Sequence, residues 1–242
     1  MTRLASITLI LALFASASPA SAAEIGTVDL AAGGLSERVV QLFLLVTVLS
    51  LAPGLAMMAT SLPLIVIVLS ILRQGAGLQQ SPPNMLIMGL AIFLTWFVME
   101  PVFAEAWKEG AAPLLAGEIT DKEAYERTTA PFAEFMSARV DPVALETLAE
   151  ARGDEPTPNA DAPALSLLAP AFVLSEIQNA FEIGFVVLLP FLIIDLLIAS
   201  ILMAMGMMMV PPSIVSLPFK LAFFVLTNGW VAISGALVRS YS

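Results

Sequence analysis

Ionisable side chains inside apolar sequence are the first candidates for chemistry in this chain. Asp195 lies within PFLIIDLLIAS and Lys220 lies within LPFKLAFF. Ionisable groups in apolar helices are costly and usually face protein or water rather than lipid. They can serve as buried contacts that hold an assembly together, or as a relay for protons or other ions. If a helical hairpin turns at Pro211-Pro212, the two residues lie roughly 12 Å apart along the axis, so partners on other subunits are at least as good an explanation as a pair within the chain.

Two further patterns could belong to an enzyme, but both are weak. Glu176 and Glu182 in SEIQNAFEIGF are six residues apart, so they do not share a helix stripe, and nothing places them around a cleft. Ser216 and Lys220 have the i, i+4 spacing of a Ser–Lys nucleophile pair, a spacing that occurs by chance. The chain has no Cys and no His, which removes thiolate and imidazole chemistry. The sequence therefore predicts no catalytic, cofactor-binding or metal-binding residue.

A dense group of methionines precedes Pro211-Pro212. Methionine at helical spacing usually packs in a core, but five within seven residues at a helix end is more than packing requires. Methionine is unbranched and soft, so copies from several subunits could form a deformable seal. The group comprises Met203, Met205, Met207, Met208 and Met209.

The composition defines the class of protein. Of the 242 residues, 59% are hydrophobic and 12% are charged, whereas a soluble domain is about half apolar and about a quarter charged. The apolar residues form long runs, which is typical of helices in lipid. The net charge of −10 argues against nucleic acid as a partner.

The beginning of the chain resembles a secretory signal. Residues 1–22 combine a basic Arg3, an apolar stretch over 4–14 and the small residues Ala20-Ser21-Ala22. We therefore expect a cleaved signal peptide and a mature N-terminus that faces outward.

Three regions follow the signal peptide. Residues 23–103 form a first hydrophobic helical region, which Pro53-Gly54 and Pro63 are expected to break. Residues 104–163 form an acidic hydrophilic segment with thirteen acids and five bases, a net charge of −8. Residues 164–242 form a second hydrophobic helical region.

Helices are expected at defined places within these regions. In the acidic segment, 122–139 and 142–152 are the expected helices. In the second hydrophobic region, 165–209 is too long for one membrane crossing, and 214–238 reads as the last helix. The expected fold is an all-α integral membrane protein, with long broken hydrophobic helices forming hairpins and one mostly helical acidic extramembrane segment.

Five long motifs stand out between about Leu44 and the C-terminus. They are MMATSLPLIVIVLSILRQGAGLQQSPPN, GLAIFLTWFVMEPVF, PFAEFM, PAFVLSEIQNAFEIGF and PFLIIDLLIASILMAMGMMMVPPSIVSLPFKLAFFVLTNGW. These motifs resemble the FliP family, the P subunit of the flagellar type III protein export gate. The resemblance implies a pentamer that assembles with the Q and R gate subunits and other export-apparatus membrane proteins, in the bacterial inner membrane at the flagellar basal body. It also implies that the assembly conducts unfolded polypeptides.

The resemblance also implies roles for individual residues. Met207, Met208 and Met209 align with the family's methionine gasket around the pore. Phe135 aligns with an aromatic residue that narrows the channel, and Glu176 aligns with a glutamate that makes contacts between subunits.

The chain departs from the family pattern at Pro63-Leu64, Gln178, Glu182 and Asn228, so salt-bridge partners cannot be carried over directly. The alternative function is an ion or proton transporter subunit that uses intramembrane Asp195, Glu182 and Lys220.

Overall fold

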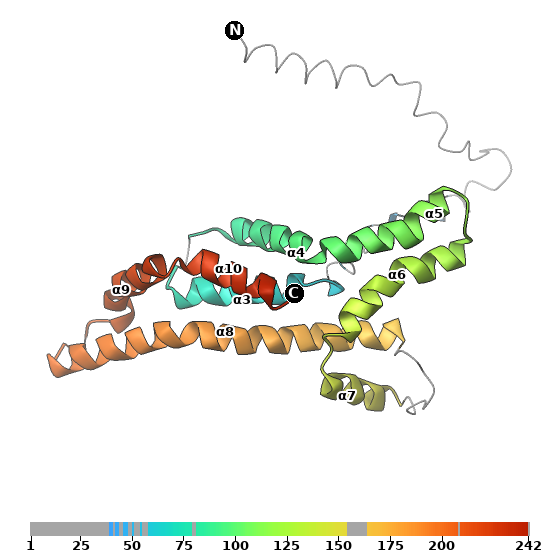
Figure 1. The fold of residues 1–242 in the computed structure, drawn as a ribbon. Helices are drawn as coiled ribbons and strands as arrows, with labels where there is room; N and C mark the ends of the chain where they lie inside the picture. The colour runs from blue at the N-terminus through green and yellow to red at the C-terminus, as the bar shows by residue number, and fades with distance from the viewer. Residues whose placement is uncertain are drawn as a thin grey trace, which may run out of the picture. The chain divides into compact units, whose positions relative to one another are not determined.

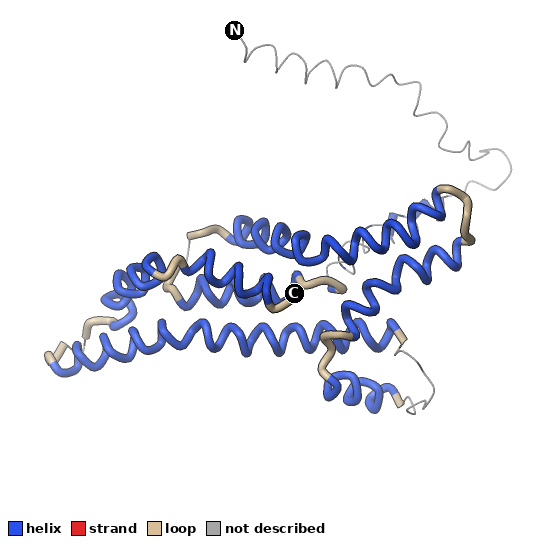
Figure 2. Tube along the Cα trace, viewed as in Figure 1, coloured by secondary structure: helices blue, strands red, loops and turns tan. Residues whose placement is uncertain are grey.

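Every regular element in the described part of the chain is a helix (Figure 2). The expected signal peptide, residues 1–22, and Met208 lie outside the described residues. The computed structural model describes residues 39–40, 42–43, 46–47, 50, 54, 58–78, 81–153, 164–207 and 209–241.

Helix α3 (Leu62–Gly75) forms the centre of the hydrophobic core. Pro63 occupies its first turn, where a missing N–H costs nothing, so the expected break at Pro63 is confirmed. Buried apolar residues recur every three or four positions, as at Ile65, Val68 and Leu72. This stripe packs between helices α8 (Leu165–Ala204) and α4 (Asn84–Ala106) (Figure 1).

The contact between α3 and α8 requires a small residue on α8. A Cβ atom at Gly184 would lie 2.4 Å from Cδ1 of Ile71. Glycine therefore allows these two helices to approach closely, and their packing fixes the position of α8.

The helical rod that begins with α4 runs well past residue 103, to Leu115 in the acidic segment. It continues through a π-helical turn, η2 (Trp107–Ala111), into the short helix α5 (Ala112–Leu115). Pro101 lies within α4 and does not end it. The chain then returns as α6 (Asp121–Ser137), which contacts both α4 and η2 (Figure 1).

The two helices expected in the acidic segment are confirmed. Thr120 and Glu123 form a capping box at the start of α6, each side chain bonding the other residue's backbone N–H. The Asp141 carboxylate accepts from the Val143 N–H at 2.9 Å and caps α7 (Pro142–Arg152). Helix α7 ends at Gly153, whose φ of 74° suits glycine.

Helix α8 is one unbroken helix of 40 residues that passes through Pro170 and Pro190. At 1.5 Å per residue it is about 60 Å long, about twice the 30 Å thickness of the hydrocarbon core. It is therefore too long for one crossing, as the sequence indicated, and part of it must lie outside the hydrocarbon.

The expectation of one last helix over 214–238 is wrong. The chain forms α9 (Pro212–Leu226) and α10 (Gly229–Arg239), which are bent by 58°. Asn228 has a left-handed φ of 50°, which interrupts the helix. A Cβ at Gly229 would lie 2.1 Å from the ring of Phe224, so glycine permits the tight bend.

Among the described residues, two helical rods are long and apolar enough to cross a membrane. One is Asn84–Leu115 and the other is α8. The bent pair α9 and α10 makes a third if it counts as one span.

Candidate functional site

The hairpin of α8 and α9 is held together by a buried ionic contact. Lys220 Nζ lies 2.5 Å from Asp195 Oδ2, and the Ser216 hydroxyl donates to Asp195 Oδ1 at 2.5 Å. Both Lys220 and Ser216 are buried, and Asp195 is partly exposed. We call these three residues the hairpin brace. The expected separation of about 12 Å between Asp195 and Lys220 is therefore wrong for this chain.

The expected separation was wrong because the turn between α8 and α9 was placed at Pro211-Pro212. Helix α8 ends at Ala204, and Gly206 has a left-handed φ of 74°. The chain reverses around Met207, with Asp195 and Lys220 nearly equidistant from it in sequence. Pro211-Pro212 marks the start of α9 rather than the apex of the turn.

The geometry of the brace argues against a Ser–Lys nucleophile. Ser216 and Lys220 both direct their donors at Asp195, and no hydrogen bond between the two is found in the described chain. Ser216 is fully buried, so a substrate carbonyl has no access to its hydroxyl. A cavity of about 250 Å³ adjoins Asp195 and Lys220, with Gln74 on its wall.

The four methionines that the structure describes at this hairpin are not part of the chain's own core. Met209 is 97% exposed and Met207 is 38% exposed. Met203 and Met205 are exposed as well. Packing within one chain therefore does not account for them.

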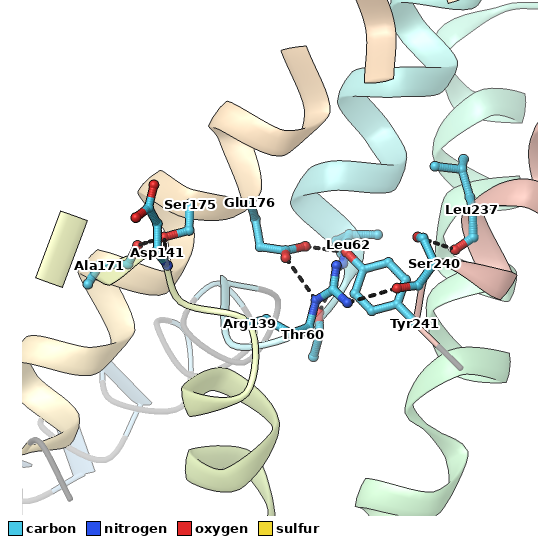
Figure 3. Close-up of polar contacts among 10 residues, drawn as sticks. All are labelled: Thr60, Leu62, Arg139, Asp141, Ala171, Ser175, Glu176, Leu237, Ser240 and Tyr241. Atoms are coloured by element: carbon cyan, nitrogen blue, oxygen red, sulfur yellow. Dashed lines mark hydrogen bonds and ion pairs between the residues drawn. The ribbon is translucent and has the colours of Figure 1, made fainter. Parts of the chain in front are cut away.

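A second polar cluster joins three distant parts of the chain (Figure 3). Glu176 on α8 is completely buried. Arg139, which follows α6, lies 3.1 Å from it through Nε. The Tyr241 hydroxyl donates to the other oxygen of Glu176. We call Arg139, Glu176 and Tyr241 the C-terminal clasp, because it ties the end of the chain to α8.

Arg139 makes further contacts within the clasp. Its Nη1 donates to the Ser240 carbonyl at 2.9 Å, and its guanidinium lies 3.8 Å from the centre of the Tyr241 ring. Burial, and then the Glu176 carboxylate, raise the pKa of the Tyr241 hydroxyl above its ordinary value. Tyr241 therefore remains a hydrogen-bond donor at neutral pH.

Phe135, the residue aligned with the channel constriction, packs directly on the clasp. Its ring stacks on Tyr241, with centroids 6.0 Å apart and planes 13° apart. It also meets Phe172 of α8 edge-on at 5.7 Å. The clasp therefore fixes where this aromatic side chain lies in the chain.

Sequence reasoning identified Glu176 but missed Arg139 and Tyr241. A carboxylate in apolar sequence requires a cation, and Arg139 is one of only five bases in the acidic segment, so a partial signal existed. No sequence signal pointed to Tyr241, 65 residues from Glu176. Glu176 is satisfied within the chain, and its role in contacts between subunits stays a prediction.

The structure does not bring Glu182 to the hairpin brace. Glu182 is exposed and accepts a hydrogen bond from Gln178 at 3.0 Å. Thirteen residues separate it from Asp195 on one helix, which is about 20 Å. The three residues named for ion transport therefore do not form one site.

Comparison with known proteins gives the family. The profile of the FliP family matches residues 45–237. The chain belongs to the FliP family. "Flagellar biosynthetic protein FliP" of Caulobacter vibrioides is 45% identical over 245 residues, covering all of this chain and 92% of the relative.

Other members of the FliP family have similar identity. The protein of the same name from Rhizobium meliloti is 47% identical, covering 86% of each chain. That from Bacillus subtilis is 46% identical, covering 84% of this chain and 91% of the relative.

Three of the residues at which we expected the chain to depart from the family pattern have clear places in this fold. Pro63 lies in the first turn of α3, and Leu64 is completely buried. Asn228 forms the bend between α9 and α10. Pro63 and Leu64 therefore belong to the start and the buried face of α3, and Asn228 belongs to the bend.

Proposed function

We propose that this chain is a channel-forming subunit of the flagellar type III protein export gate. It assembles as a pentamer with the Q and R subunits and other export-apparatus membrane proteins, at the flagellar basal body in the inner membrane. The assembly conducts unfolded polypeptides and is sealed when idle, and the chain performs no covalent chemistry. Membership of the FliP family, whose relatives are named flagellar biosynthetic proteins, supports a role in flagellar export.

The observation that carries the sealing role is the methionine turn. The brace fixes the α8–α9 hairpin, and its turn presents Met209 almost fully exposed. A flexible apolar side chain at a fixed position can contact copies of itself and can adapt to a passing chain. We propose that Met207, Met208 and Met209 form the pore gasket and that Phe135 narrows the channel.

The exposed apolar surface supports assembly with partners. Large apolar side chains on the outer face of α8 are exposed in the single chain, among them Ile193, Leu196 and Leu197. Surfaces of this kind are covered by lipid or by other proteins. A helix about 60 Å long cannot be covered by a bilayer alone, which leaves part of this surface for other subunits.

The gasket is tested by replacing Met207, Met208 and Met209 together with Ala. We expect cells with this variant to leak small ions, while the complex still assembles and some export continues. If the methionines were core residues, each truncation would cost about 2–5 kcal/mol and assembly itself would fall. The measurement is complex yield against membrane leak in the same cells, and lost assembly without leak would refute the gasket.

Participation in the export gate is tested separately. Cells lacking the native gene should regain motility and export when the unaltered chain is supplied, and the tagged chain should co-purify with small helical membrane proteins. Co-purification of the chain only with copies of itself, together with ion conduction by that oligomer, would favour transport instead.

A further inference from the structure

Helix α10 has an apolar groove on each side. The groove between α10 and α8 has a volume of about 500 Å³ and is lined by Ile183, Val186, Ile233 and Leu237 among others. The groove between α10 and α4 has a volume of about 650 Å³. Its lining includes Leu90, Leu94, Trp230 and Val231. Both grooves are open surface features of the single chain.

Each groove carries one ionisable side chain, and the two have opposite charge. Glu182 lines the groove beside α8, and its partner in the structure is the neutral amide of Gln178. Arg239 lines the groove beside α4. Its guanidinium lies back along α10, with Nη1 3.3 Å from the point that a Cβ of Gly235 would occupy. Within the described residues, Arg239 has no ion pair.

The other bases of the apolar helices already have polar partners. Lys220 pairs with Asp195 in the brace. Arg73 donates to the Asn84 side chain and to the Pro82 carbonyl. An uncompensated charge beside an apolar surface is costly once that surface is covered. Arg239 and Glu182 therefore each need a partner when the grooves are filled.

Both charges lie beside the same part of α10. The groove that contains Glu182 is lined by α10 residues between Ile233 and Ser240. The Arg239 guanidinium lies beside Gly235, within that stretch. The opposite charges therefore lie on opposite flanks of one stretch of helix. A neighbouring copy placed side by side, without sliding along α10, would bring Arg239 of one copy to Glu182 of the next.

We propose that the two flanks of α10 form the contact between neighbouring copies of this chain, with an ion pair between Glu182 and Arg239 at its centre. Such a contact joins two different surfaces of the chain. A pair of copies therefore still has one unused surface of each kind, so further copies can add until a ring closes. The apolar residues of the grooves supply the buried area, and the ion pair sets register and partner choice. This inference rests on the proposed function, because it requires copies of the chain to assemble.

The absence of cysteine from the chain allows a direct test. Two differently tagged full-length copies are expressed together in cells with the rest of the export apparatus, one carrying Glu182→Cys and the other Arg239→Cys. An Arg–Glu ion pair holds its two Cα atoms too far apart for a disulfide, so a bismaleimide crosslinker is added to the membranes. We expect a crosslinked dimer that contains both tags. The control replaces Glu182→Cys by Glu146→Cys, at an exposed site on α7 away from both grooves, and should give no mixed dimer.

Failure of this inference can be told apart from failure of the proposed function. If the two tagged copies co-purify but no mixed crosslink forms, copies assemble through another surface and the inference is overturned alone. If the copies never co-purify, both the inference and the pentamer are wrong.

A charge exchange provides the second measurement. Glu182→Arg or Arg239→Glu alone should lower recovery of the multi-copy complex at least about tenfold, because like charges meet in an apolar contact. The double variant with both changes should regain most of that loss. Equal loss in the double variant would contradict the pairing, and Glu146→Arg should have no effect.

Discussion

Replacing Arg139 by Met should weaken the fold more than any other single change of a base in the acidic segment. Methionine keeps much of the apolar length of the side chain and removes the guanidinium. The Glu176 carboxylate, which is completely buried, then loses its cation. The Ser240 carbonyl loses a donor at 2.9 Å, and the Tyr241 ring loses the cation above it.

The magnitude follows from these contacts. Removing one partner of a buried ion pair typically costs about 3–5 kcal/mol. Tyr241→Phe removes only the hydroxyl that donates to Glu176, and a hydrogen bond to a charged group contributes about 1.5–3 kcal/mol. Tyr241→Phe should therefore be milder than Arg139→Met, since the ring stays stacked on Phe135.

The assay is the temperature at which half of the full-length chain aggregates after extraction into a mild detergent at fixed salt. Arg127→Met is the matched control, because Arg127 is exposed on α6 in the same acidic segment. We expect this temperature to be well below that of Tyr241→Phe for Arg139→Met, and close to that of the unaltered chain for Arg127→Met. If Arg139→Met and Arg127→Met behaved alike, the clasp would not contribute to stability. A double variant with Glu176→Gln should regain part of the loss, because the unpaired charge is then removed.

Three further predictions concern other positions. Lys220→Met leaves the Asp195 carboxylate of the brace without its cation. Losing one partner of a buried ion pair costs about 3–5 kcal/mol, and the cost here is lower because Asp195 is partly exposed. Less complex should therefore be recovered on native gels, whereas normal recovery with export abolished would favour a proton or ion relay. Gly229→Ala should destabilise the fold by about 1–3 kcal/mol, because the added methyl group clashes with the Phe224 ring. Gly89→Ala lies in open space on α4 and should be neutral or slightly stabilising. The temperature of aggregation in detergent measures both effects. Hydrogen bonds from the Thr120 backbone and hydroxyl lower the pKa of Glu123. The stability that the Glu123 carboxylate contributes is therefore present above its unfolded pKa and is lost as pH falls through its folded pKa. As pH is lowered, Thr120→Ala should make proteolysis at the start of α6 begin at a higher pH, and an unchanged pH profile would contradict this prediction.

The helices that were predictable from sequence are those with strong local signals. Long apolar runs predicted α4 and α8, and Pro63 marked the start of α3. The helices expected over 122–139 and 142–152 match α6 and α7 to within two residues. These features depend on neighbours in the chain, which sequence displays directly.

The features that sequence did not predict depend on single backbone conformations or on distant partners. The bend lies in an otherwise apolar run, and its sequence signal, the Asn-Gly pair at Asn228-Gly229, was overlooked when one helix was expected over 214–238. The clasp joins Arg139 to Glu176 across 37 positions. No local pattern specifies such a contact, because it exists only after α6, α8 and α10 have packed.

The hairpin brace shows how one misplaced turn changes the interpretation of a buried charge. With the apex at Pro211-Pro212, partners on other subunits explain Asp195 and Lys220 at least as well as a pair within the chain. With the apex near Met207, they satisfy each other within the chain at 2.5 Å. A slide of α9 by one residue would move Lys220 by about 1.5 Å and turn it by about 100°, which would break the contact. The ion pair therefore sets the register of α8 against α9, and this register determines which methionines the turn exposes.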